Sequence, residues 1–115
     1  MYKEIILVHS IEEIEEILFK NTDDYYFIDR ELKSVEHKNT LKSLGARYMI
    51  KKSILDFLGL KDEYNDIEIE NEQSGKPVIK CSVKLLNELK KKQINKVYAS
   101  ISHSRNYITT LVVLE

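Results

Sequence analysis

The residues best suited to chemistry lie in one stretch, Ser43–Leu60, which has the longest helical pattern in the chain. Within it Arg47 and Lys51 stand four residues apart, so both fall on one side of the helix, among apolar residues. Only the aliphatic stems of such cations are easily buried, and their charged ends can form charge-assisted bonds with phosphates. On another side, Lys52 and Asp56 are also four residues apart and can pair across one turn.

A second group of candidates lies in the C-terminal half of the chain. Gly75-Lys76-Pro77 predicts a tight turn in which the backbone and a cation can meet a phosphate. Ser102 and His103 end a predicted strand, and neighbours on a strand point to opposite faces, so they cannot form a nucleophile–base dyad with each other. Such turns are also common in hairpins, and a histidine at a strand end is often only a turn residue. The three histidines, His9, His37 and His103, lack the spacing of a metal site.

The composition describes one ordered domain spanning residues 1–115. Hydrophobic residues make up 43% of the chain and charged residues 32%, which is typical of a globular protein. The net charge of −1 gives no general attraction to nucleic acid or to a membrane. A single cysteine, Cys81, excludes an internal disulfide and fits a cytoplasmic setting. The apolar run Ile5–Val8 is too short for a signal-peptide core or a membrane span.

The N-terminal half predicts a strand, a capped helix and the long central helix. The strand covers Tyr2–Val8, and Ser10 with Glu13 forms a capping box at the start of a helix that ends near Asn21. The segment 23–38 is predicted to be irregular, with an aromatic patch at 25–28 that favours the core and a helical turn that starts at Ser34 and contains Glu36. The central helix is expected over Asn39–Leu58, with Gly59 as its stop.

The C-terminal half alternates between strands and one helix. The alternation in Asp66–Asn71 predicts a half-buried strand with Ile67 and Ile69 inward, paired in a hairpin with Val78–Cys81. Ser82 is expected to cap a helix over Val83–Lys92, with Val83, Leu86 and Leu89 or Lys90 turned inward. Two further strands follow, over Val97–Ser102 and Tyr107–Leu114. These elements predict an α+β fold with a mostly antiparallel sheet packed against the central helix.

Three motifs stand in a fixed order along this pattern. Ala46–Lys51 has the sequence A-R-Y-M-I-K; Ile67–Ile69 is followed by the turn Ser74–Pro77; and Val97–His103 is followed by Tyr107 and a hydrophobic strand. In order and spacing they resemble the holo-acyl-carrier-protein synthase type of 4′-phosphopantetheinyl transferase, over nearly the whole chain. The first motif is similar to that family's A/G-R-F-A-A-K run and the second to its strand and G-K-P turn.

The resemblance implies a trimer-forming domain that moves 4′-phosphopantetheine from coenzyme A to a serine of an acyl or peptidyl carrier protein, in fatty acid or polyketide biosynthesis. In such enzymes Mg²⁺ bridges the coenzyme A diphosphate to an Asp near the N-terminus and a Glu in the central helix, and a Lys one turn later assists. The resemblance implies coenzyme A contacts from these residues: Arg47, Lys51, Gly75, Lys76, Pro77, Ser102 and His103.

The chain departs from the family pattern at each catalytic position. Ser10 stands at the position of the metal-binding Asp, Lys52 at that of the Glu, and Asp56 at that of the Lys. An ammonium group repels Mg²⁺ and cannot ligate it, so the standard metal site is predicted to be absent. Two alternatives stay open: a non-standard site that uses Glu12, Glu13 or Asp56, or Lys52 as a fixed charge beside the diphosphate.

The surface expected to bind the carrier protein also departs from the family pattern. Family members meet their acidic carriers with basic residues on the first helix, where this chain has Glu16 among four glutamates. Like charges would repel an acidic carrier there. A different basic surface is predicted from these lysines: Lys33, Lys38, Lys42 and Lys51.

Three hypotheses follow for the function. The chain is an active transferase with a rearranged site; or a non-catalytic relative that keeps the fold and binds coenzyme A, a carrier protein or another subunit; or an unrelated interaction domain whose motifs match by accident.

Overall fold

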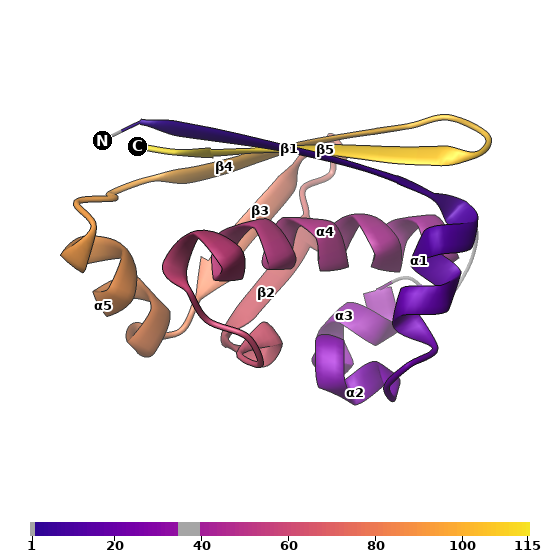
Figure 1. The fold of residues 1–115 in the computed structure, drawn as a ribbon, viewed down its shortest axis with the longest axis horizontal. Helices are drawn as coiled ribbons and strands as arrows, with labels where there is room; N and C mark the ends of the chain where they lie inside the picture. Colours follow the sequence, from indigo (N-terminus) through magenta and orange to yellow (C-terminus); the bar gives the residue numbers. More distant parts are fainter. Residues whose placement is uncertain (1, 35–39) are drawn as a thin grey trace.

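The computed structural model describes residues 2–34 and 40–115. Two antiparallel sheets and a long helix organise the fold (Figure 1). The elements follow in this order: β1 (Lys3–Ser10), α1 (Ile11–Leu18), α2 (Asp23–Tyr26), α3 (Asp29–Ser34), α4 (Thr40–Leu58), η1 (Tyr64–Asp66), β2 (Ile67–Asn71), β3 (Pro77–Cys81), α5 (Val83–Lys91), β4 (Val97–His103) and β5 (Tyr107–Leu114). The predicted α+β class, the antiparallel pairing and the long central helix are confirmed.

The larger sheet has the strand order β1-β5-β4, and the C-terminal strand lies in its middle. Along β5, every second residue from Ile108 to Leu114, Thr110 included, is fully buried, and the alternate residues face the other side of the sheet. The buried face lies over α4, which runs beneath the sheet in Figure 1. Both chain ends lie at the same end of this sheet, where β1 begins and β5 finishes.

The central helix α4 is buried around most of its circumference. Its N-terminal half packs on the first helix, where a Cβ on Gly45 would come within 2.7 Å of Ile14. The helix stops where predicted: Gly59 has φ of 72°, its N–H donates to the carbonyl of Asp56, and the N–H of Leu60 donates to that of Leu55. The predicted first residue, Asn39, lies outside the described residues.

The predicted start of the first helix and the hairpin are both confirmed. The Ser10 hydroxyl accepts from the Glu13 N–H, and the Glu13 carboxylate accepts from the Ser10 N–H, which completes the capping box of α1. This helix ends at Leu18, earlier than the predicted Asn21. Strands β2 and β3 form the second sheet, with Ile67 and Ile69 buried as expected.

The predictions for two other segments are wrong in part. The segment predicted to be irregular contains α2 and α3, and Ser34 is the last residue of α3, with Glu36 outside the described residues. In α5, Val83 is 74% exposed and Leu86 is 48% exposed, whereas Leu85 and Leu89 are buried. Apolar residues at 83, 85, 86 and 89 allow more than one inward face, and packing against the rest of the domain selects the one through Leu85 and Leu89.

Candidate functional site

Lys51 lies in the core of the molecule, and its ammonium group has partners there. The side chain is 0% exposed, and Nζ lies 2.6 Å from Glu31 Oε1 and 2.7 Å from the carbonyl oxygen of Tyr26. Burial lowers the pKa of Lys51, against the opposing attraction of Glu31. Its whole side chain is therefore buried, not only its stem as the sequence suggested, so Lys51 cannot contribute to the predicted basic surface.

Glu31 connects several elements through one buried carboxylate. It pairs with Lys51 on α4, and it also accepts the N–H of Ile28 at 3.1 Å and the N–H of Ile69 on β2 at 3.0 Å. The sequence interpretation missed this residue because it treated the segment as irregular. The available signal was the glutamate three residues after Ile28, at the start of a helix, which is the spacing of a capping carboxylate.

Arg47 is anchored beside this carboxylate and is 3% exposed. Its Nη1 donates to the carbonyl oxygen of Glu31 at 2.9 Å and to the hydroxyl of Ser34 at 2.8 Å. Burial lowers the pKa of Arg47, which nevertheless stays a cation at neutral pH because its ordinary value is far higher. Arg47 also lines two hollows, one of about 320 Å³ and one of about 170 Å³.

The smaller hollow, here called the hairpin pocket, brings together residues that are far apart in the sequence. Its lining residues come from α4, the end of β2, the β2–β3 turn and β4, and they include Lys42, Arg47, Asn71, Gly75, Ile101 and His103. Three of the predicted coenzyme A contacts, Arg47, Gly75 and His103, therefore meet in one place. The described lining residues include cationic and neutral side chains and no carboxylate, so this pocket can accept an anion.

The other predicted contacts lie around this pocket. Lys76 and Pro77 border a neighbouring hollow of about 430 Å³, which shares Gly75 and Ile101 with the hairpin pocket. Ser102 is exposed and comes directly before His103 on β4, so its side chain points to the other face of the strand. The contact of these residues with coenzyme A stays a prediction, whereas the ammonium group of Lys51, 0% exposed and paired with Glu31, has no exposed surface for a ligand.

Lys52 and Asp56 form the ion pair that their spacing predicts, with Nζ 3.1 Å from Oδ1. The two side chains are 39% and 60% exposed, so the pair lies on the surface of α4. Neither residue lines the hairpin pocket of the same chain. Within a single copy, Lys52 and Asp56 are therefore not placed to act on a ligand in the hairpin pocket, as their predicted catalytic role requires.

The donor groups at the family's metal positions do not fit Mg²⁺. The Ser10 hydroxyl caps α1, and Lys52 presents an ammonium group that repels a cation. Glu13 is engaged by the Ser10 N–H, and that hydrogen bond lowers the pKa of Glu13. Within residues 2–34 and 40–115, no group of three or more His, Cys, Asp or Glu side chains is arranged to hold a metal ion.

Comparison with known proteins places these residues in a family. The holo-acyl-carrier-protein synthase of Syntrophus aciditrophicus is 32% identical over 116 residues, covering 92% of this chain and 89% of the relative. The chain belongs to the holo-acyl-carrier-protein synthase family. A Geobacillus holo-acyl-carrier-protein synthase is 30% identical over 92% of this chain and 89% of the relative. No family model matches the chain.

Solved structures of holo-acyl-carrier-protein synthases share the fold over almost the full length. The Plasmodium yoelii structure has a TM-score of 0.77 at 25% identity and covers 99% of this chain and 96% of its own. The Helicobacter pylori structure, a complex with coenzyme A, has a TM-score of 0.77 at 21% identity. The match covers 98% of this chain and 100% of the Helicobacter chain. The accidental-match hypothesis is therefore wrong. In the part of the chain that the structure describes, every helix is too short or too polar to cross a membrane.

Proposed function

We propose that this chain is a 4′-phosphopantetheinyl transferase that binds the phosphates of coenzyme A at the hairpin pocket. The main support is the meeting of Lys42, Arg47 and His103 with the Gly75 turn in one hollow whose described lining residues include no carboxylate. Cations and a tight glycine turn suit phosphate oxygens. Gly75 has φ of 89°, a conformation that favours glycine and bends the backbone sharply beside the pocket.

In the proposed reaction, the serine oxygen of an acyl or peptidyl carrier protein bonds to the phosphorus of the phosphopantetheine phosphate. The bond from that phosphorus to the bridging oxygen of coenzyme A breaks, 3′,5′-ADP leaves, and the serine hydroxyl proton is released. Fixed positive charge stabilises such a transfer by offsetting the charge that develops on the diphosphate. Lys52 supplies that charge at the family's glutamate position, and Asp56 orients it through the 3.1 Å ion pair.

We propose that the protein is a cytoplasmic homo-trimer in which Lys52 of one copy faces the hairpin pocket of a neighbouring copy. The outer face of the larger sheet suits self-association: Ile6 on β1 is 62% exposed and lies opposite Leu111, and Tyr98 on β4 is 42% exposed and lies opposite Val113. An exposed apolar sheet face of this kind is typical of an interface. A site shared between copies would explain why Lys52 lies outside the hairpin pocket of its own chain.

A second candidate is a non-catalytic protein that binds coenzyme A. It is favoured by the side chains at the family's metal positions, the Ser10 hydroxyl and the Lys52 ammonium, which are not ligands for Mg²⁺. In this case the hairpin pocket still binds phosphates, but no group transfer follows.

Mass spectrometry of the carrier separates the two candidates. The protein is incubated with coenzyme A and apo-carrier protein, with Mg²⁺ and with EDTA, and the carrier is then weighed. A gain of one phosphopantetheine group supports the transferase, and a gain that survives EDTA supports Lys52 as the source of charge. No gain with several carriers at high protein concentration would remove the transferase proposal.

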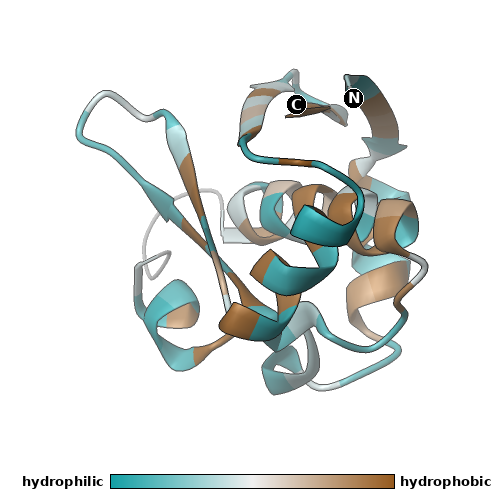
Figure 2. Cartoon of the chain, turned by 90° about the vertical axis from the view of Figure 1, so that its left-hand side faces the viewer, coloured by the Kyte–Doolittle hydropathy of each residue, from teal (hydrophilic) through white to brown (hydrophobic). Residues whose placement is uncertain are grey.

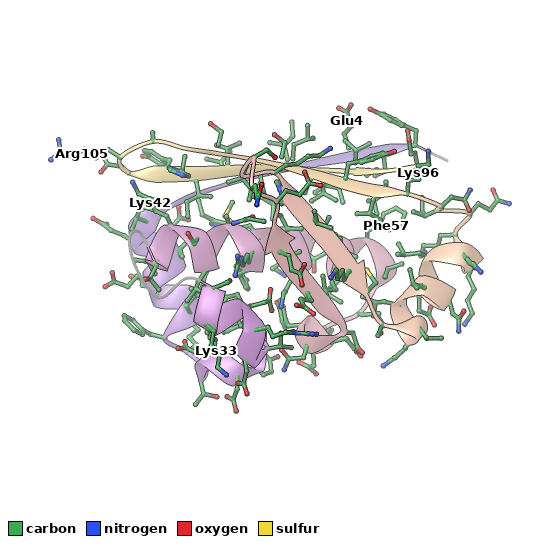
Figure 3. All side chains as sticks on the ribbon, turned by 180° about the vertical axis from the view of Figure 1, so that it is seen from behind. Glu4, Lys33, Lys42, Phe57, Lys96 and Arg105 are labelled. Atoms are coloured by element: carbon green, nitrogen blue, oxygen red, sulfur yellow. The ribbon has the colours of Figure 1, made fainter. Side chains whose placement is uncertain are left out.

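Calorimetry with coenzyme A tests the pocket itself. Lys42→Ala combined with His103→Ala should weaken binding by about tenfold or more, because a hydrogen bond to a charged group contributes about 1.5–3 kcal/mol. Lys33→Ala is the matched control, since Lys33 lies on α3, away from Lys42 at the start of α4 (Figure 3). Equal affinity for coenzyme A in the pocket variant and the control would contradict this location.

A further inference from the structure

The helix α5 and the turn after it form the most basic part of the chain. Residues 83–96 contain five lysines and one glutamate, whereas α1 contains four glutamates and no lysine or arginine. The lysines of this segment are all exposed: Lys84, Lys90, Lys91, Lys92 and Lys96. Two of the five already have carboxylate neighbours, Lys84 with Glu63 at 3.6 Å and Lys91 with Glu88 at 3.2 Å. A net positive charge remains on this face of the molecule.

An apolar hollow opens among these lysines. It has a volume of about 380 Å³ and is lined mainly by aliphatic side chains, among them Ile79 from β3, Leu86 from α5, Ile94 from the following turn and Val97 from β4. Leu86 and Val83 at its border are 48% and 74% exposed. Figure 2 views the molecule from the side that carries α5 and shows hydrophilic and hydrophobic segments next to each other along this helix.

An apolar hollow bordered by lysines fits one kind of partner. A helix that presents aliphatic residues flanked by carboxylates would fill the hollow and pair with the lysines. The acidic helix α1 of a second copy cannot be this occupant, because its apolar residues Ile14 and Leu18 are buried in its own core.

The hollow also lies close to the proposed phosphate site. Ile79 and Cys81 on β3 and Val97 on β4 line it, while Pro77 and Ile101 on the same two strands line the hollow next to the hairpin pocket. Residues two apart on a strand are separated by about 7 Å, so the two hollows follow one another between β3 and β4. A partner docked on α5 would therefore have its neighbouring residues near the Gly75 turn.

We propose that the hollow at α5 docks an acidic amphipathic helix of a partner protein and that this partner is the apo-carrier protein. The identity of the partner rests on the proposed function, whereas the docking surface itself rests on the charge and shape of α5. On this proposal the carrier approaches from α5 and not from the glutamate-rich α1.

Binding of fluorescently labelled apo-carrier protein tests the proposal directly. Lys90→Glu combined with Lys96→Glu should weaken binding by about tenfold or more, and added salt should weaken wild-type binding. Leu86→Asn should weaken binding without changing the charge, since it removes an apolar contact. The matched control is Lys20→Glu combined with Lys33→Glu, which changes the net charge equally. Lys33 lies among the helices at the lower left of Figure 3, far from Lys96 at the upper right.

Every variant is checked for unchanged coenzyme A affinity and unchanged circular dichroism, so that unfolding is not mistaken for lost docking. A weaker carrier affinity for the control pair than for the α5 pair would overturn the proposal.

A second probe separates this proposal from the transferase proposal. It is a labelled helical peptide with leucines on one face and glutamates flanking them, compared with the same peptide carrying lysines for glutamates. If the acidic peptide binds and the α5 variants lose it, the docking surface is supported, even where no carrier gains phosphopantetheine. If neither the carrier nor the acidic peptide binds the wild-type protein saturably, the proposal fails.

Discussion

The buried pair of Lys51 and Glu31 gives the sharpest prediction about the stability of this fold. Replacing Lys51 with Met keeps the length and most of the volume of the side chain but leaves the Glu31 carboxylate without its counter-charge. Both side chains are 0% exposed, so water cannot replace the lost partner. We expect Lys51→Met to lower the free energy of unfolding by about 3–5 kcal/mol, the usual cost of breaking a buried pair.

The neighbouring lysine provides the matched control. Lys52 also forms an ion pair within the same helix, with Asp56, but its side chain is 39% exposed and that of Asp56 is 60% exposed. Water and salt screen such a pair, so Lys52→Met should change the free energy of unfolding by only about 0–1 kcal/mol. The two substitutions are chemically identical and adjacent, so a difference between them measures the effect of burial.

A double-mutant cycle then isolates the pair. Glu31→Gln alone should also be strongly destabilising, because it leaves the Lys51 ammonium buried and unpaired. Glu31→Gln combined with Lys51→Met removes both charges, so its cost should be smaller than the sum of the single costs by at least about 2 kcal/mol. The double variant should still be less stable than wild type, since the carboxylate also accepts the N–H groups of Ile28 and Ile69.

Urea unfolding at neutral pH, followed by circular dichroism, measures all of these variants on one scale. A domain of this size is stable by about 5–15 kcal/mol, so the single variants should remain measurable. Equal costs for Lys51→Met and Lys52→Met, or strictly additive effects in the cycle, would refute the reasoning that Lys51 is buried against Glu31.

Three further predictions concern groups at other places in the molecule. Burial raises the pKa of Cys81 to about 11, so its alkylation by iodoacetamide at pH 8 should be about two orders of magnitude slower than that of a free thiol, and an equal rate would contradict its burial. The hydrogen bond from Tyr25 to Asp62 raises the pKa of Tyr25 to about 12, so the stability from this bond is complete below about pH 10 and is lost as the pH rises towards 12. Absorbance titration of the tyrosines should show one of them titrating earlier in Asp62→Asn, whereas an unchanged curve would exclude the bond. Ser10→Ala should lower the free energy of unfolding by about 1 kcal/mol through loss of the α1 cap, measured by urea unfolding, and a neutral effect would show that the hydroxyl does not cap the helix.

The local features of this chain could be predicted because neighbouring residues determine them. The capping box of Ser10 and Glu13, the helix stop at Gly59 and the hairpin around Gly75 each depend on residues within a few positions of one another. The Lys52–Asp56 pair is local in the same sense, since a helix fixes the distance between residues four apart. Motif order along the chain was also sufficient to indicate the family.

Tertiary structure decided what depends on residues far apart in the sequence. The burial of Lys51 required the Glu31 carboxylate from α3, since an ammonium group leaves water only where a charge and hydrogen-bond acceptors replace that water. The inward face of α5 was selected by what it packs against, because its apolar residues allow more than one choice. The hairpin pocket exists only because α4, the β2–β3 turn and β4 meet, which brings Arg47 and His103 to one hollow although nearly half of the chain separates them.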